Sequence, residues 1–174
     1  MADYADSYEA VSMFTLSGER ERVLLDTQTE CTFMWSTAGG DPVGVIMNFV
    51  ARDDRFWVTC TRRRKRVAAV EARPRVAVAV SSRGTKIGVS QAITYKGRAI
   101  VHDDAETKAW FYPALAERLM TKWGPQRVDE FAHMLDSPRR VIVEITPTMR
   151  VGYDGAKMAK ATTESREAGA LKWD

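Results

Sequence analysis

The sequence is poor in cysteine, proline, aromatic residues and long apolar runs. Of its 174 residues, two are cysteine and six are proline, and 9% are aromatic. A chain of this length can bury a core large enough to need neither disulfides nor a structural metal, so we expect Cys31 and Cys60 to be reduced thiols. No stretch approaches the ~18 apolar residues of a membrane span. The acidic first residues lack the basic and apolar pattern of a signal peptide, so we expect a cytoplasmic globular protein.

Charge is almost balanced, but its distribution is not. Lysine and arginine number 26 against 23 aspartate and glutamate residues, a net charge of +3 that neither indicates nor excludes nucleic acid. Residues 62–66 are consecutively basic (RRRKR) and are the first candidate for contact with an anionic ligand. On charge alone, a solvated turn or arginines paired with carboxylates is an equally good interpretation. A nucleic-acid surface is a weaker one, because only Phe56 and Trp57 lie nearby as stacking platforms.

The apolar pattern predicts many strands with a few helices between them. We expect helices at 17–26, 64–72, 103–122 and 128–135, and strands at 31–35, 42–50, 55–61, 76–82, 90–101 and 140–146, with a short strand through Val151 and Tyr153. Gly97 suggests a bulge or bend. The pattern favours a mainly β protein, an antiparallel barrel with peripheral helices, at residues 17–154. Residues 1–16 would be an extension, and residues 155–174 a tail that is loose or docks on a partner.

The strongest local feature is a strand, a basic turn and an alanine-rich helix in succession. The strand ends in Thr59-Cys60-Thr61, and the basic run 62–66 leads into the helix. A helix N-terminus offers unpaired N–H groups and a partial positive charge, so hydroxyl and guanidinium groups gathered there suit a phosphate. Cys60 is interpreted as a buried strand residue rather than a reactive thiolate.

The same region resembles the pyridoxamine 5'-phosphate oxidase-like family of FMN-binding split β-barrels. The resemblance rests on residues 53–59, on the basic turn, and on residues 66–78, where Arg66 stands eight positions before Pro74. Residues 95–101 and 145–154 agree with it, so that the likeness spans roughly 17–154. It implies a homodimer of six-stranded antiparallel split β-barrels, with two flavin sites in the clefts between protomers.

The resemblance also implies which residues hold the cofactor. Arg64, Lys65 and Arg66 would bind its phosphate, with a hydroxyl bond from Thr59 or Thr61. The strand Val45, Ile46, Met47 and Asn48 would lie along the isoalloxazine ring, and Gln91 would approach from the other side of the site, displaced by one position from the family's glutamine. The implied activity is hydride transfer to or from a small organic substrate, with no side chain acting as a nucleophile.

Departures from the family pattern narrow the activity. The tail 168–174 lacks the arginine and histidine pair that binds substrate in true pyridoxamine phosphate oxidases. A related branch uses the deazaflavin F420, whose phosphate and oligoglutamate tail both need cations, and five basic residues exceed the need of one phosphate. We rank FMN first and F420 second, while a flavin or haem carrier or sensor without turnover remains the rival interpretation.

Other chemistry has little support in the sequence. His102 and His133 lack the neighbouring cysteines or carboxylates of a zinc site, so no metal site is predicted. There is no Ser-His-Asp order and no phosphate-binding glycine loop. The aromatic residues Trp110, Phe111 and Tyr112 are interpreted as core or dimer packing. The substrate and the electron donor stay open.

Overall fold

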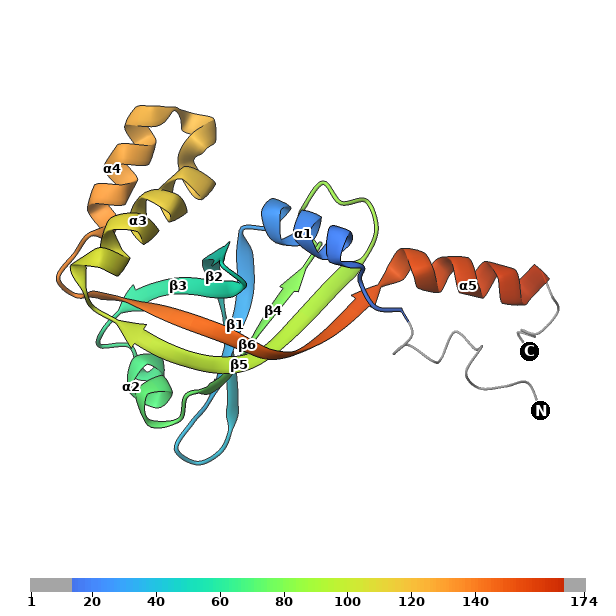
Figure 1. The fold of residues 1–174 in the computed structure, drawn as a ribbon, viewed down its shortest axis with the longest axis horizontal. Helices are drawn as coiled ribbons and strands as arrows, with labels where there is room; N and C mark the ends of the chain where they lie inside the picture. Colours follow the sequence, from blue (N-terminus) through green and yellow to red (C-terminus); the bar gives the residue numbers. More distant parts are fainter. Residues whose placement is uncertain (1–13, 168–174) are drawn as a thin grey trace. The chain divides into compact units, whose positions relative to one another are not determined.

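The computed structural model describes residues 14–167 of the chain (Figure 1). The strands are β1 (Glu30–Ser36), β2 (Pro42–Arg52), β3 (Arg55–Thr61), β4 (Arg75–Ser81), β5 (Gln91–His102) and β6 (Arg140–Asp154). The helices are α1 (Gly18–Thr27), α2 (Lys65–Ala72), α3 (Ala105–Met120), the 3-10 helix η3 (Thr121–Trp123), α4 (Pro125–Leu135) and α5 (Gly155–Glu167). No helix of the described part of the chain is long and apolar enough to cross a membrane.

The six strands form a closed barrel in the order β1-β2-β3-β6-β5-β4. The pairs β1–β2, β2–β3, β3–β6 and β1–β4 are antiparallel. This confirms the six-stranded antiparallel barrel with peripheral helices that the sequence predicts. The homodimer stays a prediction, because the structure holds one chain.

Local chemistry explains the sharp turns of the barrel. Asp53 and Asp54 join β2 to β3 with φ of 53° and 57°, and the flanking residues Arg52 and Arg55 pair. Two left-handed residues suit a tight hairpin turn, and aspartate adopts this conformation more readily than most residues. Gly97 lies within β5, at a point where this strand passes close to β6. A Cβ atom at this position would collide with the carbonyl oxygen of Thr146.

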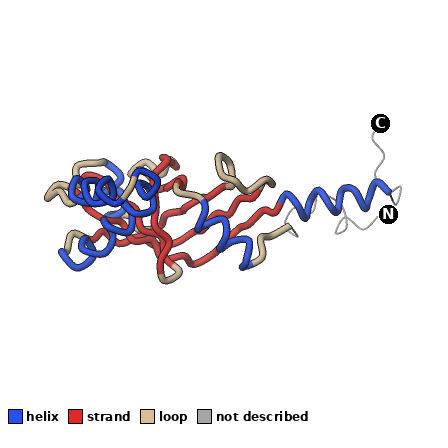
Figure 2. Tube along the Cα trace, turned by 90° about the horizontal axis from the view of Figure 1, so that it is seen from above, coloured by secondary structure: helices blue, strands red, loops and turns tan. Residues whose placement is uncertain are grey.

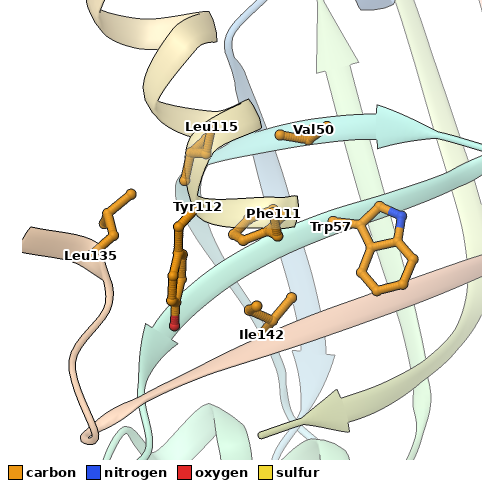
Figure 3. Packing of buried hydrophobic residues seen from close by; sticks show 7 residues of the cluster. All are labelled: Val50, Trp57, Phe111, Tyr112, Leu115, Leu135 and Ile142. Carbon is orange, nitrogen blue, oxygen red and sulfur yellow. The ribbon is translucent and has the colours of Figure 1, made fainter. Parts of the chain in front are cut away.

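The chain divides into two compact units, and residues 29–79 with 95–150 make up the larger one. Asp104 begins α3 by accepting a 2.7 Å hydrogen bond from the Thr107 N–H at Oδ1. Helix α4 is longer than the predicted 128–135, because Gly124, with φ of 94°, lets the chain turn directly into Pro125. Figure 3 shows a core cluster of side chains from β2, β3, β6, α3 and α4: Val50, Trp57, Phe111, Tyr112, Leu115, Leu135 and Ile142. Phe111 and Tyr112 are thus core residues, as predicted.

Residues 14–28, 80–94 and 151–167 are the described part of the smaller unit. Helix α1 begins as predicted, with Ser17 Oγ accepting from the Arg20 N–H at 3.3 Å. Asp154 is fully buried, and both of its carboxylate oxygens accept 2.7 Å hydrogen bonds from Nη1 of Arg20. Its Oδ1 also accepts from the N–H groups of Ala156 and Lys157, at 3.1 and 3.4 Å. One carboxylate therefore ties α1 to the first turn of α5.

One sequence expectation for the end of the chain is wrong. A single strand, β6, replaces the predicted strand 140–146 and short strand beyond Pro147. Proline is tolerated because the pairing with β3 ends at Ile145, so no donor to β3 is missing. The predicted tail begins as helix α5, which runs to Glu167 and follows β6 directly in Figure 2, and its docking on a partner stays a prediction. Residues 168–174 of that predicted tail, and 1–13 of the predicted extension, lie outside the described residues.

Candidate functional site

A cleft of about 310 Å³ opens in the larger unit where β2, β3, β6 and the helices α2, α3 and α4 meet. Its lining contains no acidic side chain. The lining residues are Ile46, Met47, Asn48, Thr59, Cys60, Thr61, Arg64, Arg66, Leu115, Leu119, Phe131, Leu135 and Arg140. Seven of the ten residues that the sequence singled out therefore line one space.

Three arginines supply the positive side of the cleft. Arg66 Nη1 donates to Met47 Sδ at 3.0 Å, and its guanidinium carbon lies 5.6 Å from the ring centre of Trp35. Within the described residues, Arg64, Arg66 and Arg140 form no ion pair. Their charge is therefore not neutralised by the protein groups described, which makes the cleft attractive to an anion.

Backbone geometry places these arginines at one end of the cleft. The N–H of Arg64 donates to the carbonyl of Thr61 at 3.0 Å, and Arg64 then becomes the N-cap residue of α2. Arg140 begins β6 and pairs directly with Thr61, the last residue of β3. Arg64 and Arg140 thus lie beside the end of β3, while Arg66, in the first turn of α2, contacts Met47 of β2.

The remaining members of the basic run do not line the cleft. Arg62 bonds Glu71 at 3.3 Å and Asp103 at 2.9 Å, so the interpretation of the run as paired arginines holds for this residue. Lys108 and Arg62 together hold the pKa of the Asp103 carboxyl below its ordinary value, Lys108 having the larger effect. Arg63 and Lys65 are exposed and are not lining residues. The run is therefore divided between the cleft, an ion-pair network and solvent.

The polar groups of the cleft differ in what they can still donate. Thr59 Oγ1 donates to the carbonyl of Val141 at 2.9 Å, which commits its proton to β6. The hydroxyl of Thr61 has no such partner among the described residues. Asn48 Nδ2 donates to the carbonyl of Thr29 at 3.3 Å. Thr61 is therefore the hydroxyl that is free to donate to a ligand.

Cys60 is a buried free thiol that faces the cleft. Burial raises its pKa above the ordinary value, while the guanidinium groups of Arg66, Arg140 and Arg64 oppose that shift. The raised pKa favours the protonated thiol, and the position of Cys60 confirms the prediction of a buried strand residue.

The opposite wall of the cleft is apolar and was not predicted. It consists of Leu115 and Leu119 from α3 and Phe131 and Leu135 from α4. Figure 3 shows Leu115 and Leu135 approaching from the two helices. The helical spacing of Leu115 and Leu119 indicated a buried face, but only the packing of α4 against α3 reveals that this face also borders the cleft.

Several singled-out residues lie elsewhere. Val45 and Lys65 are not lining residues of the cleft. Gln91 belongs to the smaller unit, where its N–H donates to Ser82 Oγ at 2.9 Å and its Oε1 is buried without a hydrogen-bond partner among the described residues. Nε2 of His102 lies 2.7 Å from Oε2 of Glu144. No group of three potential metal ligands occurs among residues 14–167.

Comparison with known protein families gives a match over most of the chain. The family model described as pyridoxamine 5'-phosphate oxidase matches residues 23–150. No curated protein is similar enough in sequence to count as a match.

Solved structures share the fold at low sequence identity. The conserved hypothetical protein Rv2991 from Mycobacterium tuberculosis has a TM-score of 0.72 and 16% identity, over 84% of this chain and 89% of that one. A FAD-binding protein from Mesorhizobium loti has a TM-score of 0.60 and 19% identity, over 80% and 96%. An F420 reductase has a TM-score of 0.55 and 22% identity, over 74% and 94%. At these identities the likeness shows the fold alone.

Proposed function

Because the chain belongs to the pyridoxamine 5'-phosphate oxidase family, we propose that it binds a flavin-type cofactor in the arginine-lined cleft and acts as an oxidoreductase. FMN is the first choice of cofactor. The observation that carries the proposal is the convergence of Arg64, Arg66 and Arg140 on a cleft that has no acidic lining residue.

The chemistry of the lining fits a flavin with a phosphate. A phosphate carries close to two negative charges and several acceptor oxygens, which three guanidinium groups and the Thr61 hydroxyl can satisfy. A flavin ring needs an apolar surface, which the four side chains from α3 and α4 provide. The backbone of residues 46–48 in β2 borders the same space and offers polar groups to the edge of a ring.

Each part of the cleft then has a role. The arginines bind and orient the phosphate, β2 sets the position of the ring, and the leucine and phenylalanine wall excludes water from it. The bound cofactor supplies the hydride chemistry, so no protein nucleophile is required. This agrees with a protonated Cys60.

F420 is the second candidate. The fold is shared with an F420 reductase, and a phosphate followed by an acidic tail would use more positive charge than FMN does. We also propose that the protein is a homodimer in which a second protomer completes each site, as the family resemblance implies. Gel filtration tests this directly, since a stable monomer would refute a contribution of a second protomer to the site.

The test is a titration of the purified protein with FMN and with F420, followed by flavin fluorescence. We expect Arg64→Gln to weaken FMN binding about tenfold or more, because a hydrogen bond to a charged group contributes about 1.5–3 kcal/mol. Arg63→Gln is the matched control, since it removes the same charge from an exposed neighbour that does not line the cleft. Equal binding by Arg64→Gln and the parent protein would refute the phosphate assignment.

Three further measurements separate the rival functions. Steady-state turnover with NADPH or reduced F420 distinguishes an enzyme from a carrier. An absorption spectrum of haem type in the purified protein would favour the haem carrier, and DNA affinity that falls steeply with salt would favour the nucleic-acid interpretation.

A further inference from the structure

A second cavity, of about 610 Å³, lies in the same compact unit and shares no lining residue with the arginine-lined cleft. It is formed where β1 ends, where β2 and β4 begin, and where β5 and β6 pass each other. The lining residues are Met34, Trp35, Ser36, Pro42, Arg75, Val76, Ala77, Lys96, Gly97, Arg98 and Thr148. Its volume is within the usual range for small-molecule sites.

The cavity combines an apolar lining with positive charge. Its apolar side chains come from β1, β2 and β4, and its charged residues are all cations: Arg75, Lys96 and Arg98. Within the part of the chain that the structure describes, none of these three forms an ion pair. Arg20, Arg55 and Arg62, by contrast, each bind a carboxylate.

The strands fix the backbone of the three cationic residues around the cavity. Lys96 and Arg98 flank Gly97, which packs against the carbonyl of Thr146 and so fixes β5 on β6. Thr148 Oγ1 donates to the carbonyl of Lys96 at 3.2 Å and adds a second link between the same strands. Arg75 is the first residue of β4. All three side chains are exposed, and a lining with three cations and no acidic residue attracts an anion.

One side chain marks the border between the cavity and the cleft. Trp35 lines the cavity and stacks on Phe33, with ring centres 5.8 Å apart. Arg66, which lines the cleft, approaches the ring of Trp35. The two spaces are therefore neighbours, each with its own set of cations, and a ligand in one does not need the residues of the other.

We propose that this cavity binds a small organic anion with an apolar body, a carboxylate carrying an aliphatic or aromatic group. Arg75, Lys96 and Arg98 bind the carboxylate, while Trp35, Val76 and Pro42 contact the apolar body. An inorganic anion alone does not explain the apolar lining, and an uncharged apolar ligand alone does not explain three cations without an ion pair. The site is separate from the cofactor cleft and does not depend on the proposed cofactor.

The experiment measures binding of the anionic fluorophore 1-anilinonaphthalene-8-sulfonate to the full chain, with FMN present at saturation and also without it. We expect one saturable site per chain that octanoate displaces. Octanol lacks the charge and acetate lacks the apolar body, so neither displaces the fluorophore at the same concentration. Arg98→Gln and Arg75→Gln each weaken binding about tenfold, as expected for loss of one charge-assisted contact.

Two controls decide where the fluorophore binds. Arg83→Gln removes an exposed charge outside the cavity and leaves binding unchanged. Arg64→Gln also leaves it unchanged, although it weakens FMN binding if the proposed function is correct. Equal weakening by Arg83→Gln, loss of the site in Arg64→Gln, or no saturable site would each overturn the proposal. So would sedimentation data showing that Ala77→Glu dissociates a dimer, because a second copy would then occupy the cavity.

Discussion

Removal of the Arg140 guanidinium separates phosphate recognition from every other contribution to cofactor binding. Arg140 is the first residue of β6, far in sequence from the basic run, yet it lines the same cleft as Arg64 and Arg66. If it binds the cofactor phosphate, Arg140→Gln weakens binding of FMN but not of riboflavin, which has the same ring and no phosphate.

The expected magnitude follows from the surroundings of the side chain. A hydrogen bond to a charged group contributes about 1.5–3 kcal/mol, and the lower end applies because Arg140 is only partly buried. A loss of about 1.5 kcal/mol weakens FMN binding about tenfold. Riboflavin affinity should change by less than about twofold, since none of its groups meets this end of the cleft.

The assay is quenching of flavin fluorescence on titration with protein, at constant ionic strength because surface charge effects are screened by salt. Arg139→Gln is the matched control: it removes the same charge from the preceding, exposed residue. The reasoning is refuted if Arg139→Gln and Arg140→Gln weaken FMN binding equally, or if riboflavin loses as much affinity as FMN.

Three further predictions concern stability, each measured by urea unfolding. Asp154→Ala should lower the free energy of unfolding by about 2–3 kcal/mol, because it removes the ion pair with half-exposed Arg20 and the cap of α5. A smaller loss than that of Arg20→Ala would contradict this. Asp54→Gly should stabilise by about 0.5–1 kcal/mol, since glycine adopts a φ of 57° without strain, and no gain would argue against the turn geometry. Burial raises the pKa of Cys31 from 9.0 to about 12, so stability should fall by about 1.4 kcal/mol per pH unit between those values, and Cys31→Ala should lessen the slope.

The sign of the alkaline effect follows from the direction of the shift. A folded-state pKa above the unfolded value favours the neutral thiol in the folded protein, so this stability is complete below pH 9.0. It is lost as pH rises toward about 12, where the folded protein also ionises. An unfolding free energy with the same pH slope in the parent and in Cys31→Ala would show that Cys31 is not the group responsible.

Much of the fold follows from short-range patterns in the sequence. Alternating and continuous apolar runs located the strands. Ser17 marked the start of one helix and Asp103 or Asp104 the start of another, because a cap acts on its own helix. Helix α5 was missed, since its composition is polar and the carboxylate that begins it, Asp154, is held by Arg20 from the other end of the chain. Pro147 suggested that the strand ends there, but β6 continues through it. The pairing of β6 with β3 ends at Ile145, before the proline, so Pro147 removes no hydrogen bond to β3.

Some residues of the candidate site could be predicted from nearby sequence, and others are brought in only by long-range contacts. The spacing within β3, the basic turn and α2 located Arg64, Arg66 and Thr61, which are close in sequence. Arg140 joins them only through the pairing of β6 with β3, and the apolar wall only through the packing of α4 on α3. Neither register nor helix packing can be read from one sequence, so both contributions required the structure.

A crystal structure of the protein with FMN tests the central claim most directly. The account predicts the phosphate within hydrogen-bond distance of at least two of Arg64, Arg66 and Arg140, with the ring between β2 and the wall formed by Leu115 and Phe131. A flavin phosphate bound away from these arginines, with their guanidinium groups turned into solvent, would contradict it.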